Sequence, residues 1–320
     1  MSNKKLKRNS FERSRARAFY IVMIPFTFFV LLTKGYPVIW GILMSFTNFD
    51  GLNMDRTKFV GLYNYIRVFQ DPEVMPAIWN VIKITLIQVP LAMIASVGLS
   101  LLLAKDRKGV GLFRVLIYLP SVLPTVASAI VWQQIYTRDG LFDNITKALG
   151  LGRQPWLSHK YLQFSLIVMM LWTCGSSILV KIAAIKAIPN DLYEAAKIEG
   201  ANSWQTTIKI TLPMMSNMLY MSLTTAIIGM LQLMGQVVML VGLGNNVGLT
   251  TVPPRTGYTY MIHMYQQIFV KNRFGYGLAL VWVYFIFIMT ITVILEKTKK
   301  YWVYTEVDDY EETKKRGKKR

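Results

Sequence analysis

A row of hydroxyl, amide and glycine residues recurs every three or four positions within an apolar stretch of the second half of the chain. The row consists of Ser222, Thr225, Gly229, Gln232 and Gln236. On a continuous helix, positions three and four apart share one face. These groups could hydrogen bond to a neutral polar solute moving along the helix, or to polar groups of neighbouring helices. The sequence leaves both interpretations open.

Two further positions could supply an amide and an aromatic face to such a solute. Gln133 and Trp172 lie in two other apolar stretches, and Trp132 precedes Gln133. A tryptophan near the end of an apolar stretch can equally serve as an anchor at a membrane interface. Gln133 and Trp172, together with Ser222, Thr225, Gln232 and Gln236, are the candidates for lining a translocation path, with packing against neighbouring helices as the alternative.

Other chemistries have no residues to support them. The phosphate-binding pattern G-x-x-x-x-G-K-[ST] is missing, so ATP and Mg²⁺ are expected on a different polypeptide. His159 and His263 stand alone, without metal-ligand spacing, and no Ser/His/Asp arrangement is readable. We predict no catalytic residue, no metal site and no cofactor in this chain.

The apolar pattern predicts an integral membrane protein. Of 320 residues, 53% are hydrophobic, and several stretches reach the roughly 20 residues needed to cross a bilayer. Six spans are expected, at about 18–47, 79–104, 110–136, 162–184, 214–241 and 277–296. Prolines should bend or interrupt the first span (Pro25, Pro37) and the third (Pro120, Pro124). The single cysteine, Cys174, lies in the fourth span, which excludes an intrachain disulfide.

Charge inside the spans bears on the source of energy. Ion-coupled carriers typically bind their ion with intramembrane carboxylates. The six predicted cores lack Asp and Glu, and Glu296 lies at the end of the last. Lys34 and Lys83 are the charges to explain, and Lys83 can reach the interface by snorkelling. The pattern favours transport driven by ATP over transport driven by a proton or sodium gradient.

A polar island, DLYEAAKIEGANSWQTTIKITLP, separates the fourth and fifth spans at residues 191–213. Pro189 and Asn190 suit the start of a helix, because proline needs no N–H donor there and asparagine can cap. Gly200 can end that helix in a left-handed conformation. Asn202 or Ser203 can then cap a second helix. We expect two short helices joined by a sharp turn, with Leu192, Ala195 and Ala196 on one face of the first.

This island resembles the EAA loop in permease subunits of binding-protein-dependent ABC importers. The family pattern is Glu-Ala-Ala, three residues, Gly, and further on Ile-Thr-Leu-Pro. Here these positions are Glu194, Ala195, Ala196, Gly200 and residues 210–213. In that family the loop docks on a separate cytoplasmic ATPase. The resemblance implies that ATPase coupling is carried by Tyr193, Glu194, Ala195, Ala196, Gly200 and Ala201, within a coupling loop at residues 185–213.

Other segments are similar to the carbohydrate-uptake permeases related to the maltose and glycerol-3-phosphate systems. They are YPVIWGILMSFTNFD with FVGLYNYIRVF, LPSVLPTVASAIVWQQIY, PWLS and FGYGLAL. The chain lacks the large external insert and the two additional spans of the maltose subunit. Its connection at 242–273 also departs from the Gly- and Pro-rich version of relatives. The resemblance implies an all-α, six-span ABC importer permease fold for a carbohydrate, with an oligosaccharide expected.

The distribution of basic residues predicts orientation. The formal charge of +19 could suggest nucleic acid, but the charge is concentrated in segments beside spans. Lys and Arg are more than twice as frequent on the side that holds both termini, the 105–108 connector and the EAA loop. We predict a cytoplasmic basic N-terminus at 1–17, a membrane domain at 18–296 and a cytoplasmic basic tail at 297–320. The tail should attract anionic lipid.

The family resemblance also implies partners. These are a second related permease, two cytoplasmic ATPase subunits, an extracellular substrate-binding protein and membrane lipid, all at a bacterial plasma membrane, with no nucleic acid. Alternatives are an ion-coupled secondary transporter and an ABC importer of a non-sugar substrate such as a glycerophosphodiester.

Overall fold

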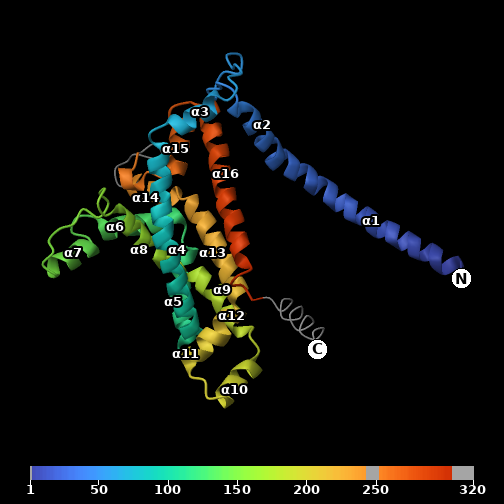
Figure 1. Ribbon diagram of the computed structural model, residues 1–320, viewed down its shortest axis with the longest axis vertical. Helices are drawn as coiled ribbons and strands as arrows, with labels where there is room; N and C mark the ends of the chain where they lie inside the picture. The colour runs from blue at the N-terminus through green and yellow to red at the C-terminus, as the bar shows by residue number, and fades with distance from the viewer. Residues whose placement is uncertain (1, 243–251, 305–320) are drawn as a thin grey trace, which may run out of the picture. The chain divides into compact units, whose positions relative to one another are not determined.

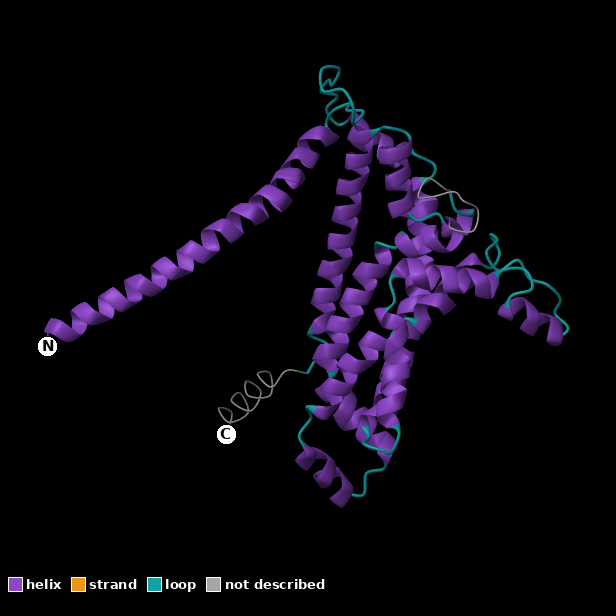
Figure 2. Cartoon of the chain, turned by 180° about the vertical axis from the view of Figure 1, so that it is seen from behind, coloured by secondary structure: helices purple, strands orange, loops and turns teal. Residues whose placement is uncertain are grey.

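The computed structural model describes residues 2–242 and 252–304, with side chains described from Ser14 onward. Residues 305–320 of the predicted basic tail, residues 243–251 of the 242–273 connection, and the basic side chains before Ser14 therefore lie outside the described part. Over the described residues the regular structure is helical (Figure 2), and the β-type pairing seen there is one isolated bridge between Thr47 and Phe59. The all-α fold class is confirmed.

The first of two units that pack separately comprises residues 1–70 and 267–283. Its helices are α1 (Ser2–Val30), the π-helix η1 (Leu31–Gly35), α2 (Tyr36–Ser45) and α3 (Tyr63–Gln70), with most of η5 (Gln266–Val270) and the start of α16 (Phe274–Lys299). Pro37 lies in the first turn of α2, directly after η1. Of the two prolines expected to bend or interrupt the first span, Pro37 coincides with an interruption, because proline lacks the N–H that would continue the hydrogen-bond ladder, whereas Pro25 lies inside α1 and does not interrupt it. The helix α1 runs without a break through the expected boundary at 17/18.

Two of the sequence motifs meet inside this unit. The buried Asn64 amide donates to the Ser45 and Thr47 carbonyls at 2.9 and 2.7 Å. The backbone of Gly275 in FGYGLAL comes so close to Thr47 that a Cβ would overlap the Thr47 carbonyl oxygen. Arg67 stacks over the Tyr276 ring at 4.5 Å. Glycine at 275 is therefore required by close backbone approach.

The second unit, residues 71–266 and 284–320, contains most of the expected bundle (Figure 1). Its long straight helix is α4 (Val74–Ala104), which packs along α9 (Gly175–Lys186) and α13 (Ser216–Leu231), while α5 (Val110–Val122) packs along α9. The remaining helices are α6 (Thr125–Tyr136), α7 (Leu141–Ala148), α8 (Leu162–Trp172), α10 (Asn190–Ile198), α11 (Ser203–Thr206), η2 (Thr207–Thr211), α12 (Leu212–Met214), α14 (Gly235–Gly242), η4 (Arg255–Gly257) and α15 (Tyr260–Tyr265).

Three described helical segments are long and apolar enough to cross a membrane: Ser14–Ser45, Val74–Ala104 and Phe274–Lys299. Three bent pairs also qualify, with bends of 100° between α5 and the segment Thr125–Ala148, 45° between α8 and α9, and 68° between Ser203–Met214 and α13. The described chain therefore has three to six candidate spans. The α5–α6 bend falls at Leu123, which is extended because it precedes Pro124, as the sequence predicts.

The bend between α8 and α9 has a different setting. No proline stands between α8 and α9, where Gly175 lies so close to α5 that a Cβ would overlap the Ile117 carbonyl oxygen. Tight helix–helix contact at a glycine accompanies this break. Cys174 occupies the N-cap position of α9, half-buried, as a free thiol.

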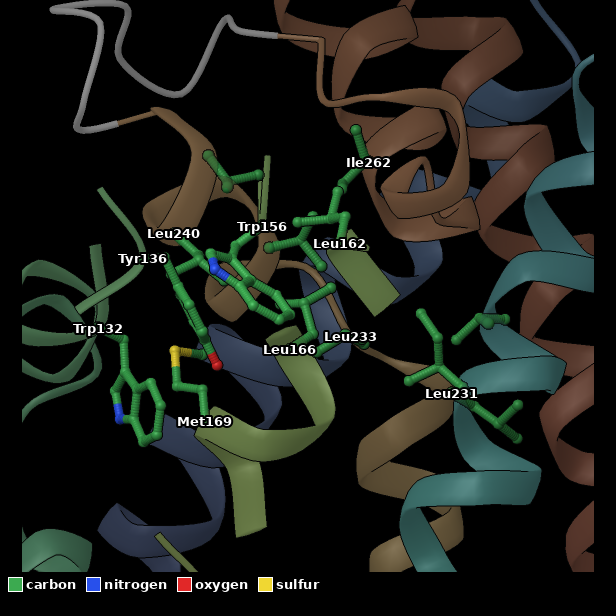
Figure 3. Close-up of a cluster of buried hydrophobic side chains, with 14 residues drawn as sticks. Trp132, Tyr136, Trp156, Leu162, Leu166, Met169, Leu231, Leu233, Leu240 and Ile262 are labelled. Atoms are coloured by element: carbon green, nitrogen blue, oxygen red, sulfur yellow. The ribbon is translucent and has the colours of Figure 1, made fainter. Parts of the chain in front are cut away.

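The core of the second unit is an aromatic and aliphatic cluster (Figure 3). It combines Trp132, Tyr136, Trp156, Leu162, Leu166, Met169, Leu231, Leu233, Leu240 and Ile262 with smaller residues. The Tyr136 hydroxyl donates to the Ser165 carbonyl at 2.9 Å, and the Ser165 hydroxyl to the Trp156 carbonyl at 2.8 Å. The cluster as a whole draws on α4 through Val81 and Ile84, on α6, α8, α13, α14 and α15, and on Trp156 and Leu233 between helices, so it ties the bent pairs to one another.

Candidate functional site: a helical hairpin and a broken helix

The polar island forms the expected hairpin, because local signals define both of its helices. The first, α10, ends at Ile198, and Gly200 follows with φ +77°. The Gly200 N–H donates to the Lys197 carbonyl at 3.1 Å and the Ala201 N–H to the Ala196 carbonyl at 2.9 Å. This pair of bonds is a Schellman motif, which needs a left-handed residue at position 200. The predicted positive φ of Gly200 is confirmed.

A capping box begins the second helix. The Gln205 N–H donates to the Asn202 side chain at 2.8 Å, and the Asn202 N–H donates to the Gln205 side chain at 2.8 Å. Of the two expected caps, Asn202 is thus the one used. The prediction for Asn190 is wrong: α10 has Pro189 at its N-cap position and no side-chain cap. Asn190 is already the first helical residue, so its side chain is one position too late.

The hairpin turns a small face inward and an apolar face outward. Ala196 is buried, and the half-buried Tyr193 hydroxyl lies 3.2 Å from Thr211 Oγ1, which ties α10 to η2. Glu194, Ala195 and Leu192 are exposed, so Ala196 alone of the predicted small face is covered. Beside the Gly200 turn, Ile198 and Trp204 are 87% and 72% exposed. These two apolar side chains are the candidates in this hairpin for contact with another protein or with lipid.

Ion pairs link the base of the hairpin to the connector after α4. Lys186, at the end of α9, donates to both carboxylate oxygens of Asp106 at 2.9 and 3.1 Å. Arg114 donates to the Leu103 carbonyl at 2.6 Å and lies 3.5 Å from the same carboxylate. The hydrogen bond and charge of Lys186, followed by those of Arg114, hold the pKa of Asp106 below its usual value.

The predicted polar stripe is not one continuous helical face. The helix α13 ends at Leu231, and α14 starts at Gly235. Buried hydroxyl groups donate hydrogen bonds to carbonyls that have lost their helical partners at the break. Tyr284 donates to the Leu231 carbonyl, and Thr259 donates to the Leu233 carbonyl at 2.7 Å. The expected fifth span at 214–241 is therefore wrong as a single helix. Irregular backbone at membrane depth requires such internal partners.

The break divides the six predicted path residues into groups. Thr225, in the middle of α13, and Gln232, in the break, are exposed, while Ser222 in α13 and Gln236 in α14 are half-buried. Trp172 is 37% exposed and meets the buried Trp132 edge to face at 5.8 Å. Gln133 is buried, and its amide donates to the Leu240 carbonyl at 2.8 Å. Gln133 thus holds the end of α14, and packing explains its amide without a solute.

One buried basic side chain was not predicted from the sequence. By its position along the chain Lys181 belongs with the basic residues flanking the EAA loop, but it is fully buried in α9, where its Nζ lies 2.6 Å from the Ser177 hydroxyl. The Ser177–Lys181 spacing of four is the available signal, since it places both groups on one helical face. Of the two charges that the sequence singles out, Lys83 lies 5.6 Å from the Trp79 ring centroid. The end of the last helix also holds a pair, in which the Tyr220 hydroxyl donates to Glu296.

Three to six long or bent apolar helices, joined in part by a helical hairpin, define a polytopic membrane protein. Comparison with known proteins then gives its family. The family described as binding-protein-dependent transport system inner membrane component matches residues 88–297, and the chain belongs to it. It is a permease.

Two relatives and one solved structure illustrate the similarity. The chain is 29% identical to the probable ABC transporter permease protein YesP of Bacillus subtilis, over 94% of this chain and 96% of that protein. It is 30% identical to the diacetylchitobiose uptake system permease protein NgcF of Streptomyces coelicolor, over 80% of this chain and 73% of that one. A bacterial alginate ABC transporter, solved in complex with an alginate pentasaccharide-bound periplasmic protein, shares the fold, with a TM-score of 0.79 at 18% identity over 92% and 98% of the chains.

Proposed function

We propose that this permease is one of two related transmembrane subunits of an ATP-driven importer that takes up a carbohydrate, specifically an oligosaccharide. An external binding protein delivers the sugar, and two ATPase subunits on the cytoplasmic side supply the energy. Family membership supports the dependence on a binding protein. The printed functions of the diacetylchitobiose and alginate systems support an oligosaccharide substrate.

The hairpin 190–211 carries the proposal. Its Schellman turn and capping box fix two short helices at a defined angle, and Ile198 and Trp204 stand exposed on either side of Gly200. Apolar side chains on a hairpin with a fixed backbone suit docking into a protein cleft, since little backbone entropy remains to be lost. We assign this surface, with Tyr193, Glu194, Ala195, Ala196, Gly200 and Ala201, to the ATPase.

The translocation path in this proposal runs along the exposed face of α13 to the break. Thr225 and Gln232 offer a hydroxyl and an amide, which suit the hydroxyl groups of a sugar. The partner permease supplies the opposite wall, so that these groups face water rather than lipid. Alternating access would open this path outward when the ATPases close and inward when they separate.

Reconstitution tests the energy source. The complete complex, in liposomes with the binding protein outside and ATP inside, should import an oligosaccharide without any ion gradient. Uptake that follows a proton or sodium gradient in the absence of the ATPase would instead assign the chain to secondary transporters. Calorimetry on the binding protein, with oligosaccharides and a glycerophosphodiester in turn, identifies the class of substrate.

Orientation is tested with single cysteines, because Cys174 is the only cysteine to remove. In a Cys174→Ala background, Ile198→Cys should react with a membrane-impermeant maleimide only after the cells are opened. Leu149→Cys, which is also exposed and follows α7, should react in intact cells. The reverse pattern would place the hairpin outside and exclude the proposed ATPase contact.

A further inference from the structure

A cavity of about 1090 Å³ lies beside the hairpin. Its lining includes Tyr193, Ala201 and Trp204 from the surface assigned above to the ATPase, but no residue of the proposed transport path. Its lining comes from the last turns of α4 with the connector that follows, from the end of α9, and from α10 with the second helix of the hairpin. Figure 1 shows α10 and α11 together at this end of the second unit.

The charged groups lining the cavity are strongly unbalanced. Asp106 is the one acidic side chain in the lining, and its carboxylate pairs with Lys186. Lys105, Arg107 and Lys197 remain, the first two from the connector and the third from α10. Among the ion pairs that the described residues form, none includes these three. Three cations around one cavity create a positive potential that favours an anionic group such as a phosphate.

The other part of the lining is apolar and belongs to a membrane-spanning helix. Leu101 and Leu102 lie in the last turn of α4, and Leu102 is 67% exposed. The cations begin at Lys105, the residue directly after that helix ends. Trp204 also lines the cavity, and tryptophan favours the boundary between hydrocarbon and headgroups. The cavity therefore passes from apolar surface at the membrane to cationic surface at its edge.

We propose that this cavity binds an anionic phospholipid, with its phosphate among Lys105, Arg107 and Lys197 and its acyl chains along Leu101 and Leu102. Free phosphate could pair with the same cations, but it has no apolar part to contact Leu101 and Leu102. The lipid touches both α4 and α10, so it couples the bilayer to the hairpin. That consequence for ATPase coupling rests on the proposed function, whereas binding itself does not.

Native mass spectrometry of the purified complex in detergent, titrated with phosphatidylglycerol, measures the binding. The test variant is Lys105→Gln/Arg107→Gln/Lys197→Gln. The matched control, Lys108→Gln/Lys209→Gln/Lys300→Gln, removes three exposed cations that do not line the cavity. Each basic side chain near an anionic surface is worth about fivefold in affinity, so removal of three should weaken lipid binding by about a hundredfold. The control should retain it as the parent does.

Competition distinguishes the lipid from its headgroup chemistry. Glycerol phosphate and inorganic phosphate should not displace the bound lipid, and phosphatidylcholine should not replace it. Equal loss in both triple variants would overturn the proposal in favour of general surface attraction. If lipid binds only after residues 305–320 are removed, the occupant of the cavity in the full chain is the acidic segment EVDDYEE and not a lipid, which would overturn the proposal. Displacement by inorganic phosphate would reduce the site to one for a soluble anion.

Binding and transport are measured separately. If ATP-driven import fails while the lipid titration succeeds, the proposed function is wrong and the site stands. If import succeeds and the two triple variants bind lipid alike, the site is wrong and the function stands.

Discussion

Replacing Gly200 by aspartate should leave the membrane part of the permease intact and uncouple it from the ATPase. The residue has φ +77°, and both hydrogen bonds of the Schellman turn depend on that conformation. A Cβ built at this position meets no heavy atom within 4 Å. The substitution therefore introduces no clash within the chain, and its effect is confined to backbone strain and to the surface beyond the turn.

The magnitude follows from these two facts. Holding a residue with a Cβ in the left-handed region costs about 1 kcal/mol relative to glycine. That strain changes the population of the formed turn by about fivefold, which is small against the stability of the whole fold. Insertion and pairing with the sister permease should be unchanged. Loss of docking well beyond fivefold would have to come from a side chain pressing on the receiving surface of the ATPase.

The matched control is Gly150→Asp. Gly150 follows α7, has φ +73°, and a Cβ added there likewise meets no heavy atom within 4 Å. The two variants therefore carry the same strain at different places. Co-purification of the ATPase and substrate-stimulated ATP hydrolysis should fall for Gly200→Asp and remain at the parental level for Gly150→Asp. Normal docking and stimulation in Gly200→Asp, or an equal fall in the control, would refute the assignment of the hairpin.

Three further predictions concern packing, path and capping. Gly175→Ala should lower the thermal unfolding temperature, because its Cβ overlaps a carbonyl of α5 and overpacking costs about 1–3 kcal/mol; a parental melting curve would contradict this. Gln232→Leu and Gln236→Leu should reduce transport without loss of assembly, and parental uptake in both variants would show that these residues only pack. Gln133→Leu should instead lower the stability of the protein by about 1–3 kcal/mol, because it removes a buried hydrogen bond. Uptake assays combined with melting curves separate the two effects. Asn202→Ala should weaken the hairpin by about 1 kcal/mol through loss of the capping box, read as faster amide exchange in α11, and unchanged exchange would show that the cap is dispensable.

Local signals made the hairpin predictable. The helix end at Gly200 and the cap at Asn202 depend on residues within a few positions, so residue type alone specifies their conformation. Which hairpin side chains are covered was not predictable in the same way. Leu192 and Ala195 remain exposed while Ala196 is buried, because the covering surface comes from segments distant in the chain.

The fifth span shows where periodicity fails. Residues 214–241 read as one apolar stretch, and a three-and-four spacing of polar groups runs through it. The helix nevertheless breaks after Leu231, and the carbonyls freed there accept hydrogen bonds from Tyr284 and Thr259, which lie 53 and 26 positions beyond the residues they bond. A break of this kind becomes stable only when such distant partners are folded against it, so the local sequence does not predict it.

The sequence by itself determined the class of the protein, through apolar length, the asymmetry of basic residues and the EAA pattern. Those properties depend on composition and on spacing along the chain, and they hold whatever the packing. Tertiary structure alone decided that Gln133 holds the end of α14, that Lys181 is an interior charge, and that a cationic cavity lies between α4 and the hairpin. Each of these depends on which distant segments meet, because burial and partner choice arise only when helices pack.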